Sequence, residues 1–137
     1  MTGFAELCAR SNFSFLEGAS HPEELVGQAK ELGLAAIAIG DRDGLYGAAR
    51  AHAESKRVDQ KYVVASEISL HRDGDGRAAD APVERALLLV EDARGYANLC
   101  HLLTRAHADQ EKGTAAIGMD EIAERTSGLT LILTDLR

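Results

Sequence analysis

A run of apolar residues, 34–39, constrains the fold of this chain more than any other feature of its sequence. The run lies between Gly33 and Gly40 and is far shorter than the roughly 18–20 apolar residues that a membrane-spanning helix needs. A short, wholly apolar segment between glycines is typical of a strand that is buried on both faces, as in a parallel sheet. The run therefore points to a sheet that is covered by helices.

Further apolar segments recur along the chain and alternate with helical patterns. The expected strands lie near residues 4–8, 34–39, 62–70, 86–90 and 129–133, and the expected helices near 20–32, 46–56, 92–103 and 119–125. Polar turns or loops are expected at 11–19, 40–44, 71–82 and 110–113. This alternation predicts an α/β domain with a mainly parallel sheet.

The first helix has recognisable start and stop signals. Ser20 is the expected N-cap, with Glu23 reaching back to it in a capping box, and Pro22 fits the first turn because its missing N–H has no helical partner there. Gly33 is the expected stop. Asp92 is the expected cap of a later helix. The apolar stripe of the first helix consists of Leu25, Val26, Ala29 and Leu32.

Length and composition set the class of protein. The 137 residues suit a single domain, since domains average about 150 residues, and the low aromatic content of 4% predicts a core of Ala, Leu, Val and Ile. The net charge of −7 disfavours direct DNA binding, which needs clustered cations. Cys8 and Cys100 form no CxxC pair, and no signal or membrane segment stands out, so we expect a reduced, cytoplasmic, soluble protein.

Polar residues follow the expected strands at 8–11, 40–43, 67–69 and 91–92. Because functional sites of α/β proteins lie at the carboxyl ends of the strands, we expect carboxylates and arginines to gather at one rim of the sheet. Strand-end loops are also polar simply because they are exposed, and the residues alone leave both readings open.

Familiar catalytic and metal motifs do not occur in the sequence. The loop 73–77 suggests calcium, but Arg77 and Ala78 stand where an EF-hand needs a ligand and a glycine. No pair of histidines has HxH or HExxH spacing. The five histidines are His21, His52, His71, His101 and His107. The residues by themselves therefore define no complete catalytic constellation.

Two segments, residues 11–26 and 31–47, read SNFSFLEGASHPEELV and ELGLAAIAIGDRDGLYG. They resemble the PHP domain of bacterial C-family DNA polymerases (DNA polymerase III alpha subunits), and most of all the error-prone subfamily of damage-induced mutagenesis. Shorter matches follow at 65–68, 87–90, 95–105 and 111–113. The resemblance implies a role in DNA replication and repair. It also implies that residues 1–137 form the N-terminal part of a longer domain, a partial, distorted β/α barrel.

Members of this family hold metal ions at their strand ends and hydrolyse phosphoesters, but here the ligands are only partly kept. The resemblance places family histidines at Cys8, Arg10 and Arg42, and less securely at Arg85, whereas Asp41, Glu67 and Glu17 match family carboxylates. Six of these residues would form the remnant site: Cys8, Arg10, Glu17, Asp41, Arg42 and Glu67.

Replacing an imidazole by a guanidinium removes a lone pair and adds a fixed positive charge. We therefore expect a metal-free and catalytically silent domain with a structural role, without a cofactor and without catalytic residues. Arg10 and Arg42 are the expected partners of Glu67 and Asp41, so that salt bridges replace the metal cluster.

Two other functions stay open at this point. One is a metal-dependent phosphoesterase in which Cys8, Glu17, Asp41 and Glu67 hold zinc or manganese. The other is a small interaction domain whose arginine rim holds a phosphate. Expected partners are the remainder of a polymerase chain or replication and translesion proteins, with neither DNA nor membrane contacted directly. A partial barrel leaves open sheet edges, which favour a homodimer.

Overall fold

A computed structural model describes residues 3–71, 84–108 and 110–134. The expected loop at 73–77 and nearly all of the expected polar loop at 71–82 lie outside these residues. Within the described ranges no helix is long and apolar enough to span a membrane.

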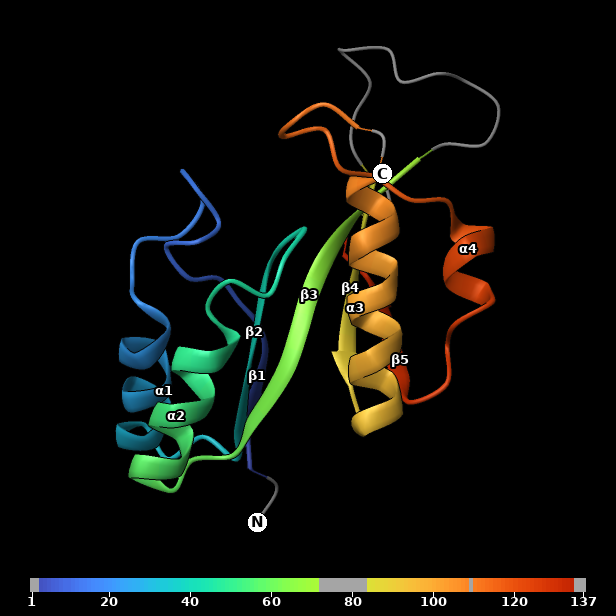
Figure 1. The fold of residues 1–137 in the computed structure, drawn as a ribbon. Helices are drawn as coiled ribbons and strands as arrows, with labels where there is room; N and C mark the ends of the chain where they lie inside the picture. Colours follow the sequence, from blue (N-terminus) through green and yellow to red (C-terminus); the bar gives the residue numbers. More distant parts are fainter. Residues whose placement is uncertain (1–2, 72–83, 109, 135–137) are drawn as a thin grey trace.

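The chain forms one curled sheet of five strands in the order β1-β2-β3-β4-β5, with helices on its outer side (Figure 1). The strands are β1 (Ala5–Ala9), β2 (Ala36–Arg42), β3 (Tyr62–Leu70), β4 (Glu84–Val90) and β5 (Leu129–Leu133). The helices are α1 (Pro22–Glu31), α2 (Ala48–Val58), α3 (Ala93–His107) and α4 (Met119–Ala123). The expected α/β class and partial barrel are therefore confirmed.

The direction of the strands changes halfway across the sheet. β1 pairs with β2 and β2 with β3 in parallel, whereas β3 pairs with β4 and β4 with β5 in antiparallel fashion. The sheet is thus mixed rather than mainly parallel. The cause lies in the connections, because parallel neighbours need a crossover, usually a helix. After β4, the helices α3 and α4 bring the chain back to the end of the sheet where β4 finished, so that β5 begins with Leu129 beside Val90 and runs antiparallel to β4.

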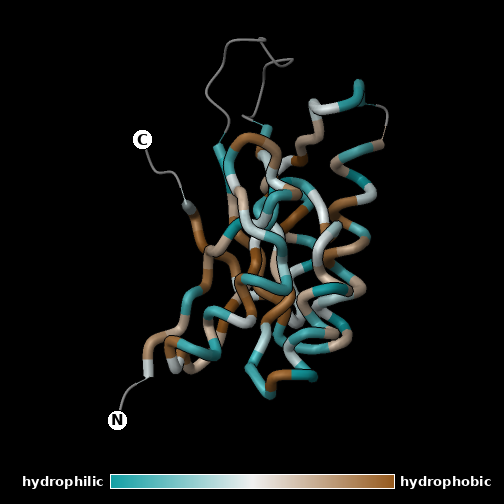
Figure 2. Tube along the Cα trace, turned by 90° about the vertical axis from the view of Figure 1, so that its left-hand side faces the viewer, coloured by the Kyte–Doolittle hydropathy of each residue, from teal (hydrophilic) through white to brown (hydrophobic). Residues whose placement is uncertain are grey.

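Apolar packing covers the outer face of the sheet in two clusters. Val26 and Ala29 of α1 pack with Ile37 and Ile39 of β2. A second cluster joins β3 and β4 to α3, α4 and the segment before α4; it contains Ile68, Leu88, Leu99, Leu102, Ile117 and Ile122. Figure 2 shows hydrophobic residues concentrated along the strands and polar residues along the helices. The core is aliphatic, as the composition predicts.

The start of α1 differs by one residue from the expectation. His21, not Ser20, is the N-cap, and its N–H donates to Glu24 Oε2 at 2.8 Å. Pro22 occupies the first helical position, which fixes the cap at the residue before it and makes Glu24, not Glu23, the acidic partner. Glu23 forms an ion pair with an arginine of α2 instead. The expected stripe holds at Val26 and Ala29, but Leu32 is exposed.

The strand predicted at 34–39 is shifted toward the C-terminus and includes the expected turn residues 40–42. Gly40 continues the strand because it leaves room for a neighbour: a Cβ there would lie 2.4 Å from Leu87 Cδ1 of β4. The turn begins at Asp43, which has a φ of 50° and accepts hydrogen bonds from Ser69 N and Oγ at 2.7 and 2.8 Å.

The start of α3 packs tightly against the loop before β5. Asp92 caps the helix as expected, accepting a hydrogen bond from Gly95 N at 2.8 Å. A Cβ on Gly95 would lie 1.8 Å from the carbonyl oxygen of Gly128. Because the obstructing atom belongs to the backbone, no side-chain rotation can relieve the clash.

We therefore predict that Gly95→Ala lowers the free energy of unfolding by about 2 kcal/mol, the usual cost of forcing backbone to shift around an added group. Gly27→Ala in the middle of α1 is the matched control. Its Cβ would meet nothing closer than Glu54 Oε1 at 3.9 Å, so the better helix propensity of alanine should raise stability by up to about 1 kcal/mol. Urea unfolding followed by circular dichroism measures both, and shifts of equal sign would contradict the packing argument.

Candidate functional site

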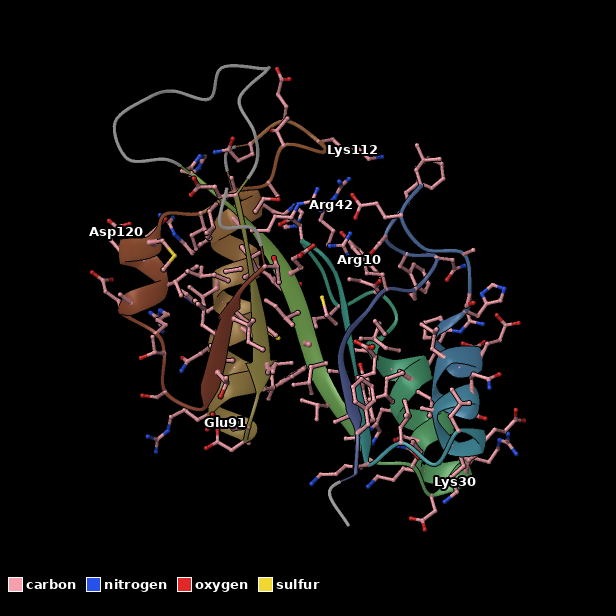
Figure 3. All side chains as sticks on the ribbon, turned by 180° about the vertical axis from the view of Figure 1, so that it is seen from behind. Arg10, Lys30, Arg42, Glu91, Lys112 and Asp120 are labelled. Carbon is pink, nitrogen blue, oxygen red and sulfur yellow. The ribbon has the colours of Figure 1, made fainter. Side chains whose placement is uncertain are left out.

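Charged side chains from three strands and from the segment after β1 meet at one end of the sheet. Arg10 follows β1 and Arg42 ends β2, and both lie at the same end of the molecule (Figure 3). Glu67 of β3 and Arg85 of β4 join them through the contacts described below. Glu91 lies at the opposite end (Figure 3). The expectation that residues 91–92 share this rim was wrong, because β4 runs antiparallel to β3 and brings its first residues there instead.

Arg10 links β1 to β3 and to the loop that precedes α1. Its Nη2 donates to Glu67 Oε2 at 2.6 Å, and its Nη1 donates to Glu17 Oε2 at 2.5 Å. Both distances are somewhat shorter than the roughly 2.7–2.9 Å usual for charge-assisted hydrogen bonds between a guanidinium and a carboxylate. The expected pairing of Arg10 with Glu67 is therefore present.

Glu17 is the second centre of the network and is contacted by three guanidiniums. Besides Arg10, Arg42 Nη1 donates to Glu17 Oε1 at 2.9 Å, and Arg85 Nη2 donates to the same oxygen at 3.3 Å. Partial burial of Glu17 opposes its ionisation, but the positive charges of Arg85, Arg10 and Arg42 outweigh that cost and hold its pKa below the ordinary value.

The carboxylate of Glu67 lies inside the protein, with only 1% of the residue exposed. Its Oε1 accepts a hydrogen bond from Thr134 Oγ1 at 2.9 Å. Its Oε2 accepts the short bond from Arg10 and a longer one, 3.4 Å, from Arg85 Nη1. Glu67 is thereby tied to the ends of β1 and β5 and to the start of β4.

Asp41 does not take part in this network, which corrects the expected pairing with Arg42. Its buried carboxylate accepts hydrogen bonds from Ser11 N at 2.8 Å, Ser11 Oγ at 2.6 Å and Ser14 Oγ at 2.7 Å. Successive strand residues point to opposite faces of a sheet, so Asp41 and Arg42 cannot both face Glu67. Asp41 instead fixes the loop after β1, and Arg42 pairs with Glu17.

Two polar residues of the site were not predicted from the sequence. Ser14 lies in a segment expected only to be a loop, and its hydroxyl joins Asp41 to the N–H of Arg42, which donates to Ser14 Oγ at 3.1 Å. Thr134 follows β5 and reaches Glu67 across 67 positions of sequence. A serine three positions after Ser11 in a loop is a weak sign of a turn that binds a carboxylate, but no local pattern marks Thr134.

Cys8 lines the same end of the sheet as a free thiol. Partial desolvation, followed by the negative charge of Glu67, raises the pKa of this thiol above its ordinary value. Because a zinc ligand must be a thiolate, the surroundings of Cys8 favour the uncharged, non-ligating form.

The donor set present at this end of the sheet does not fit a metal cluster. The carboxylates of Glu17 and Glu67 accept hydrogen bonds from guanidiniums, and that of Asp41 accepts them from hydroxyls. Within residues 3–71, 84–108 and 110–134, no three His, Cys, Asp or Glu side chains lie together in a way that would hold a metal ion.

A cavity of about 630 Å³ opens beside the network. Polar groups form part of its wall and apolar side chains of β5 another part. The lining residues are Cys8, Arg10, Glu67, Arg85, Ile132, Leu133 and Thr134. The cavity therefore lies between the two outer strands of the curled sheet and reaches the buried carboxylate.

Comparison with known sequences places this geometry in a family. The PHP domain family matches residues 6–136. An error-prone DNA polymerase of Anaeromyxobacter sp. (strain K) is 46% identical over 135 residues, covering 92% of this chain. The error-prone DNA polymerase of Mycobacterium tuberculosis (strain ATCC 25618 / H37Rv) is 42% identical over 135 residues, covering 98% of this chain. In both cases the match spans only 12% of the relative.

Solved structures share the fold at lower identity. A protein from Bifidobacterium adolescentis described as a candidate metal-dependent phosphoesterase superposes with a TM-score of 0.54 at 19% identity, over 92% of this chain and 50% of that one. An amidohydrolase from Chromobacterium violaceum, with bound sulfate and no metal, gives a TM-score of 0.56 at 22% identity, over 74% of this chain and 32% of that one. The shared fold agrees with the family match over residues 6–136. The chain therefore belongs to the PHP domain family.

Proposed function

We propose that this chain is a metal-free PHP domain in which salt bridges take the place of the metal cluster, and that it serves an error-prone DNA polymerase as a structural module. One observation carries the proposal: the buried carboxylate of Glu67 is bound by Arg10 and Arg85. In metal-bound relatives a carboxylate at such a position would serve as a ligand. Here its oxygens are occupied by guanidinium and hydroxyl donors.

The network supplies the kind of cross-link that a metal ion would otherwise supply. Guanidiniums from the residue after β1, from β2 and from β4 converge on two carboxylates, one of them in β3 and the other in the loop after β1. A buried salt bridge is not automatically stabilising, but removing one partner strands an uncompensated charge. The network therefore holds the strand ends together without any ion from solution.

The polymerase context rests on the relatives, which are named error-prone DNA polymerases. Because the match spans only 12% of those proteins, polymerisation would belong to regions outside the match. The net charge of −7 agrees with DNA contacts being made elsewhere. We infer that the module supports such a polymerase in the cytoplasm, in replication and repair.

A metal-dependent phosphoesterase is the second candidate, favoured by the fold shared with the Bifidobacterium protein. The residues at the rim do not favour this second candidate. Hydrolysis of a phosphoester by metal catalysis needs ions held by several neutral or anionic ligands, whereas the residues at this rim include three arginines in contact with the carboxylates.

β1 and β5 are the outer strands of the sheet among the described residues. Unpaired edges favour association with another strand, so the homodimer expected from the sequence stays a prediction alongside docking onto a polymerase chain.

Metal content tests the proposal directly. We expect the purified chain to contain well under one equivalent of zinc or manganese and to show no zinc binding by calorimetry. The variant carrying Cys8→His, Arg10→His and Arg42→His should gain zinc binding, because it removes two positive charges and adds three imidazole donors. Circular dichroism checks that the variant folds. Stoichiometric metal in the unaltered chain, with chelator-sensitive phosphodiester hydrolysis, would overturn the proposal.

The structural role predicts a large stability effect at Glu67. Glu67→Gln should lower the free energy of unfolding by about 2–4 kcal/mol, somewhat less than for a fully buried pair, because the guanidinium partners are partly exposed. Glu54→Gln is the matched control: Glu54 also binds an arginine, Arg57, at 2.6 Å, but on the helical surface, where such pairs contribute little. Urea unfolding measures both variants, and equal effects would show that the buried network has no special structural role.

The lowered pKa of Glu17 makes the stability of the chain depend on pH. Its pKa lies below the model-compound value of 4.5, so the folded state binds a proton less readily than the unfolded state. Its contribution is therefore complete above about pH 4.5 and is lost as the pH falls through the lowered pKa. The stability difference between the unaltered chain and Glu17→Gln should shrink in urea titrations as the pH falls below about 4.5. A difference that stays constant or grows in acid would contradict the assignment.

A further inference from the structure

We propose that a groove on the outer face of the sheet, between α2 and α3, docks an acidic amphipathic helix of another protein. We call it the β3 groove, and it is formed by Leu45, Tyr62, Val64, Tyr96 and Cys100. It contains none of the charged residues of the rim. The inference therefore goes beyond the proposed function and does not rest on the metal-free state.

The helices on the outer face leave part of β3 uncovered. α1 and α2 pack on the cluster that contains Ile37 and Ile39 of β2, whereas α3 packs on the cluster around Ile68 and Leu88. Val64 lies on the same outer face as Tyr62, two positions away, is partly exposed and belongs to neither cluster. Figure 1 shows α1 and α2 side by side, with β3 passing between α2 and α3.

Two cavities lie along the β3 groove. The loop cavity, of about 310 Å³, lies between the loop after β2 and α3, and Leu45 and Cys100 belong to its lining. The helix-end cavity, of about 330 Å³, lies at the end of α2, and Lys56 and Tyr62 belong to its lining. Both volumes are at the lower end of the roughly 300–1,000 Å³ that is usual for binding pockets, so each can receive side chains of a partner.

Tyr96 of α3 links the two cavities. Its side chain is hydrogen-bonded to Cys100 of the loop cavity. It is also close to Tyr62 of the helix-end cavity: burial, then the negative charge of Asp41 and then that of Tyr96, raise the pKa of Tyr62. One exposed aromatic side chain is therefore a neighbour of both cavities, and an occupant that fills both must pass along it.

The dimensions of the uncovered surface suit a helix. Tyr62 and Ser66 are four positions apart on β3, which corresponds to about 13 Å of strand. A helix rises about 1.5 Å per residue, so two to three turns cover this distance. A helix that lies in a groove inserts apolar side chains at helical spacing, and the two cavities are the places that receive them.

The charge of the helix-end cavity selects an acidic partner. Lys56, Lys61 and His52 line this cavity, against a single carboxylate from Asp59. Neither lysine forms an ion pair within the described part of the chain. With histidine neutral, the lining carries one net positive charge, although the chain as a whole carries −7. Charge complementarity therefore favours carboxylates on the docked helix.

The composition of the walls indicates a reversible contact with a separate protein. Tyr46 and Tyr96 are 61% and 47% exposed, and polar Thr104 and His107 belong to the lining of the loop cavity. Permanent interfaces are more hydrophobic than this. Tyrosine supplies a large contact area while its hydroxyl stays in water, so the surface is compatible with both a free and a bound state.

Fluorescence anisotropy on the 137-residue chain tests the inference with synthetic peptides. The probe is a labelled helical peptide of about 18 residues with leucines along one face and glutamates beside them. One control peptide has the same composition in scrambled order, and another has lysine in place of each glutamate. We expect the probe to bind with a dissociation constant in about the micromolar range, and both controls to bind at least about tenfold more weakly.

Two variants and their matched controls localise the binding. Tyr96→Glu should weaken it at least about tenfold, because it places a carboxylate on the wall of the groove. His101→Glu is its control: His101 is exposed and lies about 140° further round α3, so affinity should not change. Lys56→Glu should weaken binding of the acidic probe, whereas Lys112→Glu, the same charge change at the other end of the molecule (Figure 3), should not. Circular dichroism checks the fold of each variant.

Three results would overturn the inference. The first is equal binding of the probe and its controls, or equal weakening by a variant and its matched control. The second is a single-stranded oligonucleotide that displaces the probe and loses its binding in Lys56→Glu, which would make nucleic acid the occupant. The third is a dimer in light scattering that Tyr96→Glu abolishes, which would make a second copy the occupant. Stoichiometric metal at the rim would refute the proposed function and leave this inference standing.

Discussion

A carboxylate buried as deeply as Glu67, with 1% of the residue exposed, has to be compensated within the protein. An unpaired charge in such surroundings costs several kcal/mol even after relaxation. Arg10 after β1, Arg85 of β4 and Thr134 after β5 supply the compensation. These partners are distant in sequence, so the charge of Glu67 can be accommodated only when the curled sheet has formed around it.

The antiparallel pairing of β3 with β4 also contributes to the compensation of the charge on Glu67. In the antiparallel register Glu67 lies opposite Leu87, and Arg85 lies opposite Ser69, so Arg85 is the diagonal neighbour of Glu67 on one face. A parallel β4 would instead bring its carboxyl end, with Glu91, toward this rim. A second carboxylate beside the buried one would add repulsion, and the mixed sheet avoids it.

Local sequence patterns predicted the elements well, and the site only in part. Apolar runs and caps such as Asp92 mark strands and helices because they depend on nearby residues. The direction of β4 depends on how its connections cross the sheet, which the composition of the strand does not encode. The Arg10–Glu67 pair follows from two strand ends that meet at one rim. The partner of Asp41 was predicted wrongly, because the alternation of strand side chains turns it away from Arg42, and Thr134 carries no local signal at all.

The guanidiniums of the rim share their carboxylate partners, so the replacement of one arginine affects the whole network. An imidazole in place of Arg10 alone would leave Glu67 with Thr134 and the 3.4 Å contact to Arg85, and Glu17 with its contacts to Arg42 and Arg85. The two remaining guanidiniums would still bind the carboxylate oxygens that a divalent cation would need as ligands. We therefore expect such a single substitution to lower stability without creating a metal site.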